Sequence, residues 1–170
     1  NRHETGELRP DGQPGFDTNT GRIEFFSTMY YGVGLEPLPW YQEPPTSPVS
    51  TPELFAEMPY ILSTGRRSWE FFHSEHRNLA SMREFHPDPL VDMNSEDAAR
   101  EGIEQGDWVW IETEWGKIRE VADLYYGVKE DVINLEHTWW YPEVKDAGHG
   151  WQFSQVNQLI DHYAQDPHSG

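Results

Sequence analysis

Prolines crowd residues 32–59, a segment that holds more than half of the 13 prolines in the chain. Proline fixes φ and lacks a backbone N–H, so this segment can form neither a long helix nor a central strand. It also carries anchors that a free linker would lack, among them Leu38, Trp40 and Tyr41. We therefore expect an extended segment that packs on a folded domain, with one helical turn at residues 50–55.

The chain as a whole has the composition of a single folded domain. Its 170 residues suffice to bury a core, and its 36% hydrophobic and 14% aromatic content is far above that of a disordered segment. We expect an extended, proline-rich lead-in over residues 1–57 that packs on the domain, followed by the domain itself over residues 58–170.

Local patterns predict short strands and few helices. Alternating apolar residues, a reversal near Trp115 and Gly116 and a returning β-type run predict a β-hairpin within residues 106–127. Further β-type runs predict strands at residues 23–27, 60–64 and 132–136. Capping residues and a terminal glycine predict a short helix over residues 94–102, and a second helix is expected over residues 154–163. These elements favour a mainly β, barrel-like domain with long ordered loops.

Charge and cysteine content exclude several functions. The chain has 30 acidic and 12 basic residues and a net charge of −18, which disfavours duplex nucleic acid and anionic lipid as partners. It has no cysteine, which excludes disulfides, thiolate catalysis and iron–sulfur ligation within the chain. No apolar run approaches the roughly 20 residues of a membrane span, so we expect no membrane insertion.

Basic residues gather in the stretch ILSTGRRSWEFFHSEHRN, residues 61–78. A strand that ends at Gly65 would allow a ligand to approach the backbone, and Arg66 and Arg67 supply forked donors suited to phosphate. These features favour a diphosphate site at this loop. Alternatively, both arginines pair with some of the 30 acidic residues and have only a structural role.

The second half of this stretch adds polar side chains that suit a heterocycle or a phosphate, namely His73, Ser74, His76, Arg77 and Asn78. A metal site is the rival interpretation, because His73 and His76 can share a helix face. No third or fourth ligand follows at a metal-binding spacing such as HExxH, so we expect no metal bound by this chain. No Ser-His-Asp arrangement indicates acyl transfer either.

Three other positions are candidates for contact with planar ligands. Asp97 can accept hydrogen bonds from a guanine, with Asn94 beside it, although both residues also suit a helix cap. His137 precedes two tryptophans that can form either a core or a flat wall against a ring. Asn157 lies in a polar stretch that is predicted to be helical. The residues around it do not by themselves predict a function for it.

The order of these motifs resembles the C-terminal domain of the dimethyl sulfoxide reductase family of molybdenum and tungsten enzymes. Five motifs follow one another as in that family: GFDTNTGRIEFFS, PWYQEPPTSPVSTPELF, YILSTGRRSWEFFHSEHRN, DMNSEDAAREGIEQGDWVWIETEWGKIR and EHTWWYPE. The resemblance implies a six-stranded double-psi β-barrel of the aspartate-decarboxylase type. It also implies that the domain covers the pterin, diphosphate and guanine of bis(molybdopterin guanine dinucleotide), which holds Mo or W.

The resemblance also implies a set of cofactor-binding residues. The strand-end loop near the cofactor matches Thr64, Gly65 and Arg66, with Arg67 beside them. The segment that faces pterin and phosphates matches His73, Ser74, His76 and Arg77. The guanine end matches Asn94 and Asp97, and two further positions match His137 and Asn157. All these loops are expected to converge on one face.

Two departures from the family pattern matter. Thr138 stands where the family often has glycine, which puts close backbone approach to the cofactor in doubt there. The sequence also ends at DPHSG, where relatives usually continue through one more strand. We therefore expect the barrel to be cut before its last strand.

The resemblance implies that catalysis needs the rest of a larger enzyme. The metal ligand belongs to an earlier domain, so this chain is expected to be inactive alone. Its expected partners are the remaining domains of a prokaryotic oxidoreductase and, as a further candidate, an iron–sulfur electron-transfer subunit, in the cytoplasm or on an exported face. The alternative function is a protein-interaction module that uses residues 32–59, and a third is a histidine-based metalloenzyme.

Overall fold

The computed structural model describes residues 1–164. The chain divides into two compact units, one over residues 1–44 and one from Pro45 onward. The boundary falls inside the proline-rich segment, earlier than the predicted start of the domain at residue 58. The packing of the lead-in on the domain stays a prediction.

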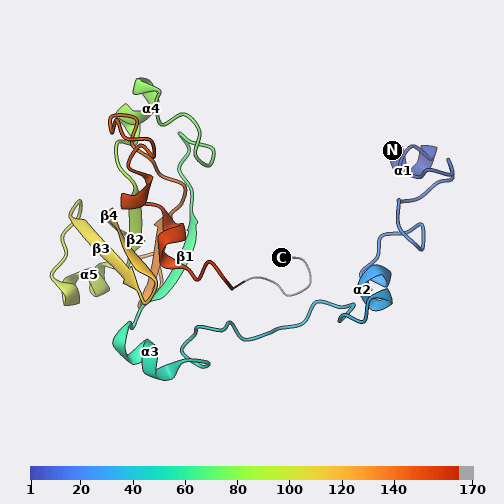
Figure 1. Ribbon diagram of the computed structural model, residues 1–170, viewed down its shortest axis with the longest axis horizontal. Helices are drawn as coiled ribbons and strands as arrows, with labels where there is room; N and C mark the ends of the chain where they lie inside the picture. Colours follow the sequence, from blue (N-terminus) through green and yellow to red (C-terminus); the bar gives the residue numbers. More distant parts are fainter. Residues whose placement is uncertain (165–170) are drawn as a thin grey trace. The chain divides into compact units, whose positions relative to one another are not determined.

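The first unit has two short helices and no strand in residues 1–44, all of which the structure describes. Helix α1 spans Arg2–Thr5 and helix α2 spans Thr28–Gly32 (Figure 1). The predicted strand at residues 23–27 is therefore wrong. Ser27 instead caps α2 by accepting a hydrogen bond from the Tyr30 N–H, because a serine side chain offers the backbone a local alternative to strand pairing.

The second unit contains a five-stranded mixed sheet (Figure 1). Its strands are β1 (Ile61–Arg66), β2 (Leu90–Met93), β3 (Trp108–Thr113), β4 (Gly116–Leu124) and β5 (Val132–Glu136). They are arranged in the order β1-β5-β2-β4-β3, with β1 and β3 at the edges. The mainly β class is confirmed. The six-stranded double-psi barrel stays a prediction, because the sheet of the described residues has five strands.

The directions of pairing decide where the strand ends lie. β1 is parallel to β5 and β2 is parallel to β4, whereas β2–β5 and β3–β4 are antiparallel. The carboxyl ends of β1 and β5 therefore lie side by side, at the end of the sheet where β2 begins. The predicted hairpin is confirmed as β3 and β4, and β1 continues through Gly65 rather than ending there.

Short helices connect the strands. They are α3 (Pro52–Glu57), α4 (Ala80–Phe85) and α5 (Ser95–Glu101), followed after β5 by the 3-10 turns η1 (Trp151–Phe153) and η2 (Val156–Leu159). The helix predicted over residues 94–102 is confirmed as α5, which the Asn94 side chain caps and Gly102 ends in a left-handed conformation. The helix predicted over residues 154–163 is reduced to η2. Helix α4 lies at one end of the sheet and α5 near the other (Figure 1).

Three apolar clusters hold the sheet, its helices and its loops together, and one of them joins Met93, Ala98 and Ala122. The main cluster consists of Val91, Ile111, Ile118, Leu135, Val156 and Leu159. A second cluster joins Phe71, from the loop after β1, to Trp139 and Tyr141, from the loop after β5. Trp139 is fully buried, and burial of so large an apolar side chain contributes roughly 2 to 3 kcal/mol. The second cluster thus fixes the loops that follow β1 and β5 against each other.

Candidate functional site

A small pocket of about 120 Å³ lies at the end of the sheet where β1 and β5 finish. Its lining consists of Arg66, Arg67, Ser68, Phe71, Phe72, His73, Arg77, Glu136 and His137. Five of these residues are predicted site residues, namely Arg66, Arg67, His73, Arg77 and His137. The parallel pairing of β1 with β5 brings the two motifs together although they are far apart in the sequence.

Arg66, the last residue of β1, contacts carboxylates of the same sheet. Its Nε and Nη2 donate to Asp92 and Asp123 at 2.5 and 2.8 Å, and its Nη1 lies 3.7 Å from Glu136 Oε2. Burial opposes the charged form of Arg66, but these hydrogen bonds leave its pKa raised. Pairing with acidic residues, the alternative weighed from the sequence, is thus observed for Arg66. Arg67 is exposed and makes no ion pair within residues 1–164.

Arg77 is buried between two aromatic rings. Its side chain is 2% exposed, and its Cζ lies 4.2 Å from the ring centroid of Phe71 and 4.6 Å from that of Trp139. Its Nη2 lies 3.6 Å from Glu136 Oε1. Burial lowers the pKa of Arg77 to about 10, and the Glu136 carboxylate opposes that shift. Arg77 therefore remains a cation at neutral pH and forms a charged wall of the pocket.

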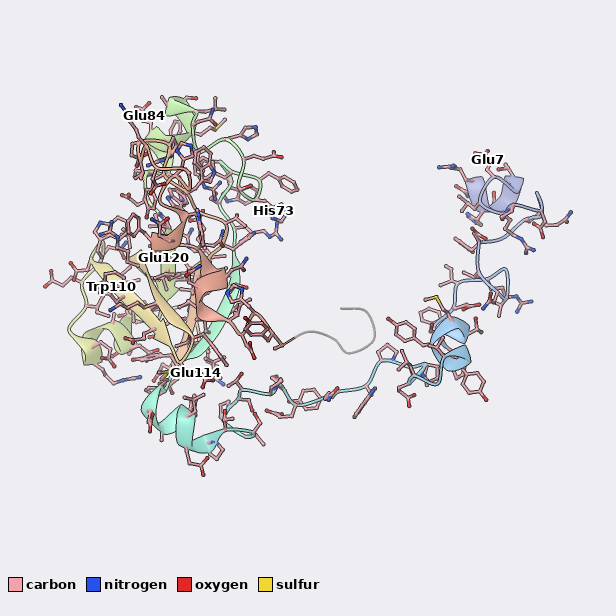
Figure 2. The ribbon with its side chains drawn as sticks, in the orientation of Figure 1. Glu7, His73, Glu84, Trp110, Glu114 and Glu120 are labelled. Carbon is pink, nitrogen blue, oxygen red and sulfur yellow. The ribbon has the colours of Figure 1, made fainter. Side chains whose placement is uncertain are left out.

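Glu136 is the buried carboxylate on which the basic side chains of the pocket converge. Besides the two arginines, it lies 2.7 Å from His86 Nε2 and accepts a hydrogen bond from the Leu90 N–H. Glu120 belongs to β4, which β2 separates from β5 in the sheet, and its Oε2 accepts a hydrogen bond from the Glu136 N–H at 3.3 Å (Figure 2 labels Glu120). Burial raises the pKa of Glu120 well above its ordinary value. Burial thus disfavours a second negative charge next to Glu136.

His137 and His73 meet at the rim of the pocket. His137 Nε2 and His73 Nδ1 are 3.3 Å apart, so one ring donates a hydrogen bond to the other. Burial lowers the pKa of His137, and the nearby charge of Arg67 acts in the same direction. Both His73 and Thr138 have positive φ angles, 50° and 63°. Thr138 therefore keeps the backbone conformation that a glycine would favour at this position.

Two buried polar atoms of the pocket lining, Ser68 Oγ and Arg77 Nε, have no hydrogen-bond partner in the described part of the chain. Buried polar atoms are normally paired, so both atoms are available to a bound ligand. Acceptor oxygens of a phosphate or the polar edge of a pterin would suit these atoms. The pocket therefore fits part of a pterin dinucleotide, but its volume is too small for the whole molecule.

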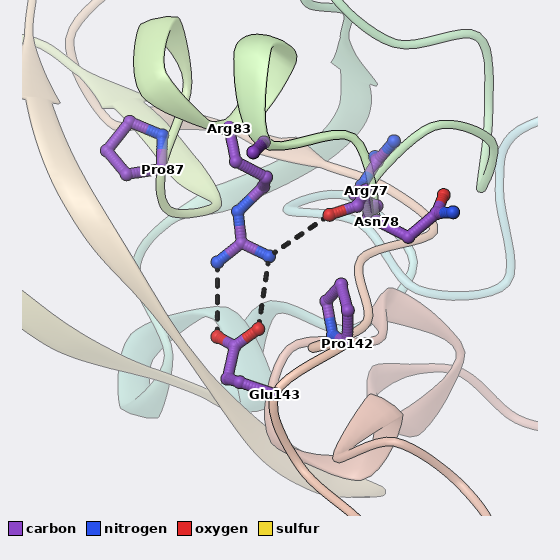
Figure 3. Close-up of a pocket in the computed structure, with 7 residues that line it drawn as sticks. Arg77, Asn78, Arg83, Pro87, Pro142 and Glu143 are labelled. Carbon is purple, nitrogen blue, oxygen red and sulfur yellow. Dashed lines mark hydrogen bonds and ion pairs between the residues drawn. The ribbon is translucent and has the colours of Figure 1, made fainter.

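A second, more open hollow of about 390 Å³ lies between the loops around α4 and residues 142–143 (Figure 3). Arg83 Nη2 and Nη1 donate to the Glu143 carboxylate at 3.1 and 3.3 Å, and Nη1 also donates to the Arg77 carbonyl oxygen at 3.5 Å (Figure 3). The charge of Arg83 is thus already neutralised, while Arg77 forms part of both hollows.

Asn94 and Asp97 lie near the other end of the strands, where β2 ends and α5 begins. Asp97 is fully buried, its Oδ2 accepts a hydrogen bond from the Asp131 N–H, and its Oδ1 lies 2.6 Å from Arg100 Nη2. The Asn94 side chain caps α5 and donates to the Val128 carbonyl oxygen. Asn94 therefore has the capping role that the sequence left open, whereas Asp97 binds Asp131 and Arg100 rather than a helix N–H. The expected convergence holds for the five pocket residues and does not include these two.

The remaining predicted residues line neither hollow, namely Thr64, Gly65, Ser74, His76 and Asn157. The Gly65 N–H donates to the side chain of Asn134. The Ser74 carbonyl oxygen accepts a hydrogen bond from the indole of Trp140. These five positions stay predictions.

Sequence reasoning missed Glu120, Glu136 and His86. A signal existed for Glu120, which shares one face of β4 with Ile118 and Ala122 and so places a carboxylate in the core by strand alternation. Glu136 belongs to the EHTWWYPE motif, but its role depends on which strands lie beside β5. His86 follows a helix that the sequence did not predict.

Two features are absent from residues 1–164. No three or more histidine, aspartate or glutamate side chains gather there as metal ligands. No helix in that range has the length and apolarity needed to cross a membrane.

Comparisons with known proteins agree on one family. A family model described as Molydopterin dinucleotide binding domain matches residues 60–170. A dopamine dehydroxylase of Eggerthella lenta is 64% identical over 164 residues, and acetylene hydratase of Syntrophotalea acetylenica is 33% identical over 129 residues. These matches cover 94% and 76% of the chain but only 16% and 18% of those relatives. The chain thus spans about a sixth of the length of these curated relatives.

A solved structure has the same fold. Acetylene hydratase from Pelobacter acetylenicus matches with a TM-score of 0.79 at 27% sequence identity. The match covers 91% of this chain and 22% of that chain. The arrangement of strands and loops described above is therefore shared with one part of a much longer protein.

Proposed function

Because the chain belongs to the molydopterin dinucleotide binding domains of the dimethyl sulfoxide reductase family, we propose that it is the cofactor-binding domain of a larger molybdenum or tungsten enzyme. The cofactor is bis(molybdopterin guanine dinucleotide), and the metal ligand lies in another domain. The observation that carries this proposal is the pocket at the ends of β1 and β5, where basic side chains surround two unpaired buried polar atoms.

The residues of the pocket would have different tasks. Arg67 and His73 are exposed and would contact the diphosphate from the solvent side. Arg77 and His137 would contact it from the inner wall, where Arg77 has an unpaired Nε. Arg66 is held by three carboxylates and would support the wall. When bound, the cofactor supplies the metal centre for the reaction, while this chain binds and orients it.

The guanine end is proposed to lie near α5, at Asn94 and Asp97, with Asn157 as a further contact. A dinucleotide joins two ring systems through a diphosphate, so its two ends need not share one pocket. Asp97 would have to exchange a present partner, Arg100 or the Asp131 N–H, for the guanine. Four residues are proposed as rim contacts, namely Thr64, Gly65, Ser74 and His76.

The whole protein is proposed to be a prokaryotic oxidoreductase. A relative with 64% identity carries the name dopamine dehydroxylase, which supports a redox reaction. The isolated chain would be inactive, and its partners would be the remaining domains and an iron–sulfur electron-transfer subunit. A six-stranded double-psi barrel remains part of this proposal as the finer fold class.

Cofactor retention in the full-length enzyme tests the proposal. Arg67→Ala should reduce the content of both guanine nucleotide and metal several-fold, because Arg67 has no ion pair within residues 1–164 that would divert its charge. The melting temperature should stay unchanged. Lys145→Ala, another exposed cation, is the matched control. Undiminished guanine and metal content in both Arg67→Ala and His137→Gln would contradict the proposed site.

A further inference from the structure

The outer face of the β3–β4 hairpin exposes several large aromatic side chains. Trp108 and Trp110 alternate with core-facing residues along β3, and they are 46% and 61% exposed (Figure 2 labels Trp110). Lys117 and Arg119 lie beside them on β4, and Phe153 of η1 lies next to Arg119. We call these five residues the tryptophan–cation face.

The two cations of this face rest on aromatic rings. Lys117 Nζ lies 5.2 Å from the ring centroid of Trp110. Arg119 Cζ lies 5.1 Å from the ring centroid of Trp108 and 5.4 Å from that of Phe153. Contact with ring faces orders both side chains but leaves their N–H donors without an acceptor. The face is therefore arranged before any partner binds.

Neither cation has a carboxylate partner in the described part of the chain, residues 1–164. Glu112 stands opposite Lys117 in the strand register, yet the two charged groups lie beyond ion-pair distance. Other basic side chains of the second unit are paired with carboxylates, among them Arg66, Arg77, Arg83 and Arg100. Arg67, Lys129 and Lys145 also lack an ion pair within residues 1–164, but Lys117 and Arg119 differ from them in lying together on one face of β4 against aromatic rings.

We propose that the tryptophan–cation face docks on a surface of the same enzyme, outside these 170 residues, that combines apolar side chains with at least one carboxylate. The proposal rests on the proposed function, in which this chain is one domain of a longer enzyme. Exposed tryptophan and arginine are the residues that contribute most to interfaces, and the cations require an acidic counterpart. The relatives contain about five times more chain than is aligned here, and covalent connection favours such docking through high effective concentration.

Lysine chemistry on the native full-length enzyme tests whether the face is covered. The chain has three lysines, all exposed in this structure, and only Lys117 belongs to the face. Limited acetylation followed by mass spectrometry should label Lys117 at least several-fold less than Lys129 and Lys145, each normalised to unfolded enzyme. Labelling of Lys117 as fast as the two control lysines would overturn the proposal.

Zero-length carbodiimide cross-linking identifies the occupant, because it joins an amine only to a carboxylate in contact. The expected product links Lys117 to an aspartate or glutamate of the same polypeptide outside residues 1–170. A link to a second copy or to a separate protein, or no link beyond residues 1–170, would refute the proposed occupant. Lys117→Gln should abolish the product and leave guanine and metal content unchanged. Loss of cofactor in the Arg67→Ala variant is independent of this result, so the two proposals fail separately.

Discussion

The molecule contains two clusters in which a cation lies against aromatic rings, and they differ in burial. Arg77 is enclosed by Phe71 and Trp139 and lies 3.6 Å from a buried carboxylate. Arg119 lies on Trp108 and Phe153 at the surface and has no carboxylate within ion-pair distance in residues 1–164. The ring contacts are similar, but only the buried cation has a counter-charge.

Solvent explains the difference. A cation that leaves water loses several kcal/mol of hydration, which an opposite charge must offset, so Arg77 requires Glu136. A cation at the surface keeps most of its hydration, and a ring face is sufficient to order it. The buried cluster therefore maintains the shape of the pocket, while the exposed cluster remains available for contact. The next four predictions test this contrast.

The largest expected effect is that of Arg77→Met. Removal of the Arg77 guanidinium leaves the buried carboxylate of Glu136 with fewer partners. The free energy of unfolding should therefore fall by roughly 3 to 5 kcal/mol. Arg119→Met is the matched control and should lower it by about 1 kcal/mol or less. Urea denaturation followed by circular dichroism measures both. Equal losses in the two variants would show that burial does not separate the clusters.

Glu120→Gln should stabilise the protein by an amount that grows with pH. Burial raises the pKa of Glu120 in the folded state above its ordinary value of 4.5. The stability that Glu120 contributes is fully present below the unfolded-state pKa and is lost as pH rises through the folded-state pKa. Glutamine resembles the protonated form at every pH, so above the folded-state pKa the variant should gain about 1.4 kcal/mol per unit of pKa elevation.

Urea denaturation of both proteins at about pH 5 and about pH 8 measures this gain. Glu104→Gln, at an exposed position, is the control and should show no such dependence. A difference between Glu120→Gln and the parent protein that is the same at both pH values would be inconsistent with a protonated Glu120.

Glu143→Gln tests an ion pair of intermediate burial, since the side chains of Arg83 and Glu143 are 19% and 58% exposed. Burial acts to raise the pKa of Glu143, but the hydrogen bond from Arg83 leaves it lowered. Its contribution is therefore present above the unfolded-state pKa and lost as pH falls through the folded-state pKa. Solvent screening limits the loss at neutral pH to about 0.2 to 1 kcal/mol. Thermal unfolding checks this value, and a loss comparable to that of Arg77→Met would contradict it.

The smallest effect is expected for Thr138→Gly, next to Trp139 of the buried cluster. Thr138 has a φ of 63°, which is strained for a β-branched residue, and glycine removes that strain while adding freedom to the unfolded chain. The two effects nearly cancel, so the melting temperature should change by only a few degrees at most. A loss of more than about 2 kcal/mol would show that the Thr138 hydroxyl, which donates to the His137 carbonyl oxygen, matters more than the backbone.

Elements with a clear local pattern were predicted well. The hairpin and α5 depend on alternation, turn residues and caps within a few residues of one another, and both are present. Strand β2 has only four residues and follows two closely spaced prolines, so it carries too little local signal. The run at residues 23–27 has β-forming residues but no strand beside it, and local hydrogen bonds replaced the expected pairing.

The basic stretch at residues 61–78 was found from the sequence, but the roles of its arginines were not. Adjacent residues Arg66 and Arg67 have the same chemistry, and nothing local distinguishes them. Asp92 and Asp123, which occupy Arg66, come from other strands. Which arginine remains available for a phosphate therefore depends on the order of strands in the sheet.

The amino-acid sequence determined the hairpin, helix α5, the mainly β class and the motif order that identified the family, because each follows from residue type and short-range spacing. The tertiary structure alone decided that the ends of β1 and β5 meet, that Glu136 lines the pocket and is bonded to Glu120, and that Asn94 and Asp97 lie near the other end of the strands. The reason is physical: strand direction and the pairing of buried charges depend on contacts between residues that are distant in the sequence.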